Sequence, residues 1–247
     1  MRQPETKHLN RFYAGTSGWA YAAWKPEFYP AKLPAKDFLK FYSTQLNAVE
    51  VNYTFRRMIN EKTIAGWLAQ TPEDFRIVVK AHQMITHIRR LKNAEEPLER
   101  FVDSIRPLAQ AGRLGPVLFQ LPPNLKADLE LLNSFLELVP RSLRASFEFR
   151  HATWFNEDVF AILKQHNAAL CIAEDDDLQT PQRVTADFAY FRLRRSEYSA
   201  AERQRIAAEI RKLLEDTGEI YAFLKHEERP ESPLYARELL QAAAIPD

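Results

Sequence analysis

Two glutamates and a lysine lie near the ends of β-rich segments of this sequence, where side chains of a catalytic site commonly occur. They are Glu50, Glu148 and Lys80. Two carboxylates in different surroundings can divide into a proton donor and a proton acceptor, and a lysine beside them can act as an acid, a base or a nucleophile. We therefore expect these three residues to be catalytic, in an enzyme that works by acid/base chemistry.

Arginines near the same segments indicate the charge of the substrate. Arg150 and Arg192 are suited to clamp an anion, because a guanidinium offers a carboxylate or phosphate two parallel hydrogen bonds. We expect a small phosphorylated or carboxylated, sugar-like substrate. The residues expected to bind it are Trp19, Asn52, Gln120, Arg150, His151, Trp154, Arg192 and Lys225.

A scaffold must bring these residues together, and strand-like segments alternate with helical ones along the chain. Runs rich in β-formers predict eight strands, over residues 12–17, 48–53, 76–81, 116–121, 144–150, 169–174, 186–192 and 219–225. Apolar periodicity predicts helices over residues 35–46, 61–70, 98–111, 128–138, 156–166, 199–216 and 234–244, and only 175–185 lacks a helical pattern. This alternation predicts an α/β fold, a single (β/α)8 TIM-like barrel domain over residues 1–247. An open doubly wound sheet is the alternative.

Strand periodicity predicts which side chains point into that barrel. Successive residues of a strand face opposite sides, so the apolar set that packs against the helices identifies the inward set. The inward set is Glu50, Asn52, Thr54, Lys80, Gln120, Ser146, Glu148, Arg150, Tyr190, Arg192, Tyr221, Phe223 and Lys225. In the sixth strand either Glu174 or Asp175 points inward. The charges lie near the C-terminal ends of their strands, where barrel sites occur, and favour a ligand pocket over a self-neutralising network that stiffens the barrel.

The same residues are also compatible with other chemistries. We expect no resident cofactor and no metal site, but a divalent cation in an isomerase- or endonuclease-like barrel is an alternative. Its candidate ligands are Glu50, Glu148, Glu174, Asp175 and His82. The nearby lysines and arginines would repel such a cation. A Schiff base on Lys80 or Lys225 is a further alternative.

The composition restricts partners and location. Lys and Arg number 34 against 33 Asp and Glu, a net charge of +1 that makes nucleic acid an unfavoured partner. The basic runs 89–92 and 192–195 nevertheless leave a non-catalytic ligand- or nucleic-acid-binding barrel as a third interpretation. The single cysteine, Cys171, allows no disulfide within the chain. With no apolar leader and no membrane-length apolar run, a cytoplasmic location and no membrane partner are expected.

Several longer motifs resemble those of a known family. They are Gly15-Thr16-Ser17-Gly18-Trp19, Phe28-Tyr29-Pro30, Val49-Glu50-Val51-Asn52, Leu118-Phe119-Gln120-Leu121-Pro122-Pro123, and Glu148-Phe149-Arg150-His151 with Trp154. On these motifs the chain resembles the YecE-like family of uncharacterised proteins, a domain of unknown function. The resemblance implies a TIM-like barrel and no established activity.

The chain departs from the family pattern after two strands. Leu193-Arg194-Arg195 stands where many relatives carry a His-Gly pair, and Leu224-Lys225-His226 stands where many have an Asn-rich end to the eighth strand. The loops after the seventh and eighth strands often bind phosphate in barrels. We therefore expect the ligand to differ from that of the relatives.

Overall fold

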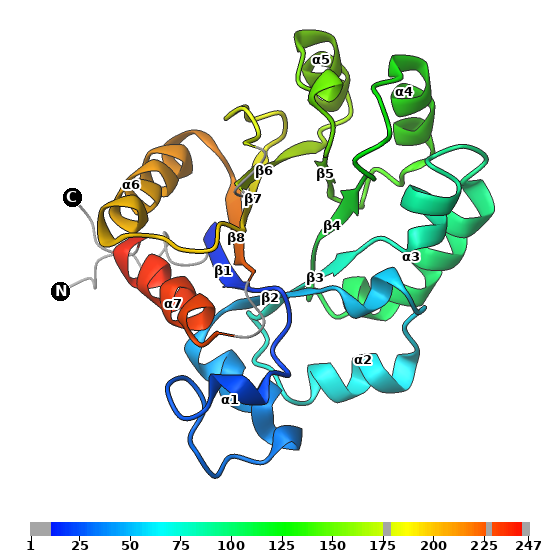
Figure 1. Cartoon of the computed structure of the whole chain (residues 1–247). Coiled ribbons are helices and arrows are strands. Elements are labelled where there is room, and N and C mark those ends of the chain that lie inside the picture. The colour runs from blue at the N-terminus through cyan, green and yellow to red at the C-terminus, as the bar shows by residue number, and fades with distance from the viewer. Residues whose placement is uncertain (1–10, 175–178, 226–228, 244–247) are drawn as a thin grey trace, which may run out of the picture.

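Eight parallel strands form a barrel with helices around its outside (Figure 1). The structure is a computed structural model that describes residues 11–174, 179–225 and 229–243. The strands are β1 (Phe12–Thr16), β2 (Ala48–Val51), β3 (Arg76–Lys80), β4 (Leu114–Gln120), β5 (Ala145–Glu148), β6 (Ala169–Glu174), β7 (Phe188–Leu193) and β8 (Glu219–Leu224). The helices are α1 (Phe38–Gln45), α2 (Glu61–Leu68), α3 (Glu95–Gln110), α4 (Leu129–Leu138), α5 (Glu157–Gln165), α6 (Ala200–Asp216) and α7 (Glu231–Ala243). The predicted TIM-like barrel is confirmed.

The strands pair in the order β1-β8-β7-β6-β5-β4-β3-β2. No helix occurs among residues 179–185, as the sequence predicts for that connection. In the described part of the chain, no helix has the length and apolar character needed to cross a membrane.

Side-chain caps start several of the helices where the sequence predicts them. Asp128 accepts a hydrogen bond from the backbone N–H of Leu131, and Asn156 accepts one from Val159. Ser199 forms a reciprocal capping box with Glu202 at the start of α6. Each cap satisfies a backbone donor that has no partner within the first turn of a helix.

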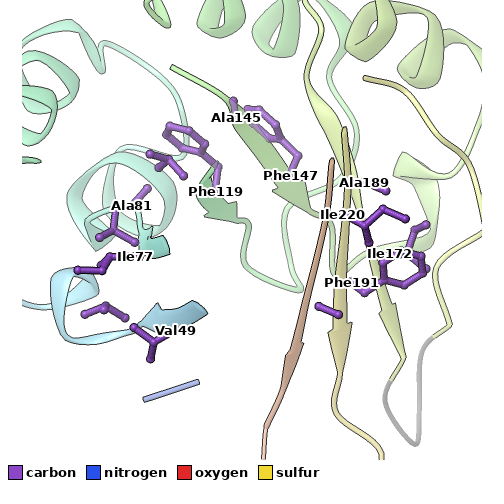
Figure 2. Close-up of a cluster of buried hydrophobic side chains, with 14 of the residues drawn as sticks. Val49, Ile77, Ala81, Phe119, Ala145, Phe147, Ile172, Ala189, Phe191 and Ile220 are labelled. Atoms are coloured by element: carbon purple, nitrogen blue, oxygen red, sulfur yellow. The ribbon is translucent and has the colours of Figure 1, made fainter. Parts of the chain in front are cut away.

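Two apolar layers confirm the strand periodicity. One layer lies between the strands and the helices, and Figure 2 shows part of it, with Val49, Ile77, Phe119, Phe147, Phe191 and Ile220 among its members. The other fills the inside of the barrel and comprises Tyr13, Ala48, Val78, Leu118, Ala169, Cys171, Ala173, Phe188, Tyr190, Tyr221 and Phe223. Alternate residues of seven strands enter the two layers, and in β5 the inward positions are the polar residues Ser146 and Glu148. The inner apolar layer therefore lies directly below the charged side chains at the C-terminal ends of the strands.

The structure corrects the prediction for Thr54. The strand ends at Val51, and residues 53–55 form a 3-10 turn, so strand alternation stops before Thr54. The Thr54 hydroxyl donates to the backbone carbonyl of Lys80 at 2.7 Å instead of pointing into a pocket. This bond ties the end of β2 to the end of β3.

The barrel closes between β1 and β2 mainly through side chains. The Asn47 side chain accepts from the backbone N–H of Ala14 at 2.9 Å and donates to the carbonyl of Phe12 at 2.7 Å. A Cβ atom on Gly15 would lie 1.9 Å from the carbonyl oxygen of Ala48, so only glycine allows this approach. A parallel bridge between Ser17 and Glu50 continues the closure. Glu50 is thereby fixed at the seam.

Candidate functional site

Arg192 joins the two carboxylates that the sequence predicts as an acid/base pair. Its Nη2 donates to Glu50 Oε1 at 2.8 Å, and its Nη1 donates to Glu148 Oε2. All three side chains are buried at the C-terminal end of the barrel. Buried charges are stable only when they are paired and hydrogen-bonded, and one guanidinium leaves one of the two negative charges to be balanced by other cations.

Hydrogen bonds from three side chains hold Glu50 in its ionised form. Besides Arg192, the Ser17 hydroxyl donates to Oε1 at 2.7 Å and the Tyr190 hydroxyl donates to Oε2 at 2.6 Å. Burial by itself raises the pKa of Glu50, but the charge of Arg192 and the three hydrogen bonds outweigh it, so the pKa is lowered. Burial and the neighbouring carboxylate raise the pKa of Tyr190 well above its usual value, so its hydroxyl remains a donor.

Glu148 is surrounded by arginines. Arg194 Nη1 donates to its Oε1 at 3.0 Å, and Arg150 Nη1 lies 3.4 Å from the same oxygen. Burial opposes ionisation, but Arg192 and Arg194 outweigh burial and lower the pKa of Glu148 to about 2. Both buried glutamates are therefore carboxylates at neutral pH.

Lys80 is a cation of the site whose charge changes near neutral pH. Its Nζ donates to Gln120 Oε1 at 2.7 Å and lies 4.2 Å from the centre of the Phe55 ring. Burial, followed by the positive charge of Arg192, lowers the pKa of Lys80 to about 8, although both glutamates oppose the change. The amine is therefore available in protonated and neutral forms between pH 7 and 9.

A cavity of about 660 Å³ opens at this end of the barrel. It is lined by Asn52, Tyr53, Phe55, Arg56, Arg57, Lys80, Gln120, Arg192, Arg194 and Lys225. Six of these side chains are cationic, and within the described residues none of the lining side chains is a carboxylate. Glu50 and Glu148 pair with the buried arginine and do not reach the cavity lining. The cavity is therefore a positively charged compartment of a size that suits a small molecule.

Five predicted site residues line this cavity. They are Asn52, Lys80, Gln120, Arg192 and Lys225. Arg192 differs from the predicted anion clamp, because both of its Nη atoms bind glutamates and only its buried Nε lacks a partner among the described residues. Arg150 contacts Glu148 but does not line the cavity.

Two predicted substrate-binding residues lie elsewhere. Trp154 is completely buried, stacks on Phe149 with ring centres 4.5 Å apart, and donates its indole N–H to the carbonyl of Leu125. His151 Nδ1 accepts from the backbone N–H of Thr153 and so caps a short turn. Both residues follow β5, but their contacts shape the loop and do not reach the cavity.

The sequence left open whether Glu174 or Asp175 points into the barrel, and the structure shows that Glu174 does not. Cys171 and Ala173 belong to the inner layer, so Glu174 faces the helices, where it pairs with Arg205 of α6 at 3.4 Å. Asp175 and His226 lie outside the described residues. Across the described ranges, no group of three or more His, Cys, Asp or Glu side chains is arranged to hold a metal ion.

Three cavity cations were missed as binding residues by the sequence analysis: Arg56, Arg57 and Arg194. Arg194 is the next inward position after Arg192, one residue beyond the end of β7, so strand alternation continued past the strand would have found it. Arg56 and Arg57 follow the 3-10 turn after β2, and their approach to the cavity depends on that turn. Periodicity carries no information about side chains in such a loop.

The chain matches one protein-family model and is similar in sequence to two curated proteins. The model of a family described as "Protein of unknown function DUF72" matches residues 13–246. The chain is 28% identical to the UPF0759 protein YunF of Bacillus subtilis over 150 residues, which are 58% of this chain and 52% of YunF. It is also 28% identical to the UPF0759 protein YecE of Escherichia coli over 144 residues, which are 58% of this chain and 50% of YecE. The matches thus span about half the length of these curated relatives.

A solved structure supports the same grouping. A DUF72 family protein from Thermotoga maritima superposes with a TM-score of 0.84 at 28% identity, covering 94% of this chain and 98% of that protein. The similarity confirms the barrel over nearly its full length.

Proposed function

The chain belongs to the DUF72 family of proteins of unknown function, and we propose that this member binds a small anionic substrate in the cavity beside Arg192 and acts on it by acid/base chemistry through Lys80. The observation that carries the proposal is the lining of the cavity, which has six cationic side chains and, in the described residues, no carboxylate. Such a surface concentrates positive potential in a confined space, which favours the binding of an anion.

Lys80 is the group best suited to move a proton. A catalytic acid or base works best when its pKa is close to the working pH, and the pKa of Lys80 is lowered to about 8. Its Nζ is held by Gln120 on one side and by the ring of Phe55 on the other, at the cavity wall. We assign Lys80 as the catalytic residue.

Glu50 and Glu148 support the site in this proposal. Each has both carboxylate oxygens occupied by hydrogen bonds from neighbouring side chains, and each has a lowered pKa. A proton transferred to either would break an ion pair with Arg192 in a buried setting. We assign them as positioning residues that hold Arg192 and Arg194 at the cavity, and their predicted acid/base role remains an alternative that kinetics can distinguish.

The substrate class is a phosphate or carboxylate compound of metabolite size. A cavity of about 660 Å³ lies within the roughly 300–1,000 Å³ range of small-molecule sites. The guanidiniums of Arg56, Arg57 and Arg194 match the geometry of either anion. We keep the cytoplasmic location in the proposal, since the buried free thiol of Cys171 suits a reducing compartment.

Titration calorimetry with inorganic phosphate, citrate and ribose 5-phosphate tests the proposal. The double variant Arg56→Gln/Arg57→Gln removes two exposed cavity cations, and we expect it to bind the preferred anion about tenfold more weakly, a loss of about 1.4 kcal/mol. The matched control Arg100→Gln removes an exposed arginine of α3 whose partner is Glu96, and its affinity should equal that of the wild type. If none of the anions binds the wild type, or if the double variant binds equally well, the proposal is wrong.

A further inference from the structure

A second, apolar groove adjoins the cationic cavity. It has a volume of about 300 Å³ and is lined by Ser17, Gly18, Trp19, Ala20, Tyr21, Val51, Asn52, Tyr53, Thr63 and Trp67. Asn52 and Tyr53 line the groove and the cationic cavity alike, so the two spaces meet at these residues. One ligand that occupies both would have an anionic part and an apolar part.

Aromatic rings form the walls of this groove. Trp19 and Trp67 meet edge to face with ring centres 5.5 Å apart. Tyr53, at the junction with the cationic cavity, exposes 51% of its surface, which is unusual for a large side chain in this protein. Exposed aromatic rings beside a positively charged pocket are typical of sites that stack a planar ring attached to a phosphate.

The polar atoms of the groove argue for a flat ring rather than a sugar. Ser17 Oγ donates to Glu50, Thr63 Oγ1 donates to Asn60, and the Tyr21 hydroxyl donates to the carbonyl of Ser17. Each of these hydroxyls already donates its proton, so a sugar in the groove would find few side-chain donors for its own buried oxygens.

One buried acceptor of Asn52, a residue that lines both cavities, lacks a partner. Asn52 Oδ1 is buried and has no hydrogen-bond partner in the described part of the protein. Buried side-chain oxygens are almost always satisfied, so an unsatisfied one at the border of two cavities indicates a missing donor. A hydroxyl of a ribose at this border would supply it.

We infer that the ligand is a nucleoside monophosphate, with its phosphate in the cationic cavity and its base in the aromatic groove. This inference rests on the proposed function, because the cavity must bind the anion for the groove to select what is attached to it. The ribose would then lie beside Asn52 at the junction, and the base would contact Trp19 and Tyr53.

Titration calorimetry with five ligands tests both parts of the site. The ligands are AMP, CMP, ribose 5-phosphate, inorganic phosphate and adenosine. We expect at least one nucleotide to bind tenfold or more tightly than ribose 5-phosphate, since stacking of a base on an aromatic side chain contributes about 1–3 kcal/mol. Adenosine, which lacks the phosphate, should bind at least tenfold more weakly than that nucleotide.

Two variants locate the base. In Trp19→Leu and in Tyr53→Ala the ratio of the ribose 5-phosphate and nucleotide dissociation constants should fall from at least ten to about one. Tyr53 is half exposed, so its variant should fold even if Trp19→Leu does not. Leu138→Ala, which shortens an exposed apolar side chain on α4, is the matched control and should keep the wild-type ratio.

The outcomes separate this inference from the proposed function. If inorganic phosphate and ribose 5-phosphate bind but the base adds no affinity, the nucleotide assignment is wrong and the anion site stands. A preference for the nucleotide that survives in both variants would also overturn the assignment, as would adenosine binding as tightly as the nucleotide. If no phosphate compound binds, the inference and the proposed function are both wrong.

Discussion

Arginine, glutamate and tyrosine side chains form a network at each end of this barrel, and the two networks differ in depth and charge. At the N-terminal end, Arg144 donates to Glu219 and to the Tyr221 hydroxyl, and that hydroxyl donates to Glu219 at 2.6 Å. This lower network has one positive and one negative charge. The exposed fractions of Arg144 and Glu219 are 35% and 27%, so water reaches both.

The C-terminal network, here the upper network, is buried and has an excess of cations. Arg192 is 3% exposed at its side chain and both glutamates are fully buried, while Lys80 and two further arginines surround them. A network that neutralises itself needs nothing more, whereas one with surplus charge beside a cavity can accept a ligand of opposite charge. The same three residue types thus stabilise one end of the barrel and, in the proposed function, position the cations of a binding site at the other.

Replacing Arg192 should have the largest effect on stability. Arg192→Met leaves Glu50 and Glu148 buried without the guanidinium that joins them, and removing one partner of a buried ion pair costs about 3–5 kcal/mol. We expect that loss in the free energy of unfolding, measured with urea at pH 7. A loss below about 1 kcal/mol would show that the upper network is no more important to folding than an exposed pair.

Acid should act on the upper network through Glu148. Its pKa is lowered from 4.5 to about 2, so its contribution to stability is complete above pH 4.5 and is lost as the pH falls from 4.5 toward 2. The shift corresponds to about 3 kcal/mol. Urea unfolding of the wild type and Glu148→Gln across this range should show a smaller pH dependence in the variant. Equal slopes would mean that Glu148 is not the group that titrates.

The charge of Lys80 should control anion binding on the alkaline side. The protonated amine attracts an anion, and the pKa of Lys80 in the free protein is about 8, so affinity should fall as the pH rises. Between pH 7 and 9 the fall is about tenfold if only the protonated form binds. Calorimetry with ribose 5-phosphate at these two pH values measures it.

A conservative variant makes this prediction specific. Lys80→Arg keeps a positive charge that does not titrate in this range, so its affinity should be nearly equal at pH 7 and 9. If the variant retains the tenfold fall, another group causes the pH dependence, and the assignment of Lys80 as the proton-transfer residue is weakened.

Strand periodicity predicted the buried part of the upper network because alternation is a strict geometric rule. Glu50, Glu148 and Arg192 were each placed inside the barrel by their apolar neighbours, and all three are there. The rule gives a direction for each side chain but no distances. It could not show that both Nη atoms of Arg192 would bind glutamates, because that depends on strand register and barrel closure.

Residues beyond the strand ends were predicted less well. Thr54 and Trp154 follow strands by only a few residues, yet each lies in a turn whose hydrogen bonds decide its direction. Arg56 and Arg57 also follow such a turn, and it is the turn that places them at the cavity. Local turn geometry depends on contacts with other strands, and a single sequence carries little information about those contacts.

Removing the arginine of the lower network should have the smallest effect. Arg144→Met deletes one ion pair whose members are both partly hydrated, and such pairs contribute about 1 kcal/mol or less. Glu219 keeps the hydrogen bond from Tyr221 and remains in contact with water, so no buried charge is left alone. We expect a loss of at most about 1 kcal/mol in urea unfolding and an unchanged affinity for ribose 5-phosphate. A loss of unfolding free energy as large as that of Arg192→Met would show that solvent exposure does not explain the difference between the two networks. A loss of affinity for ribose 5-phosphate would show that the lower network affects ligand binding at the other end of the barrel.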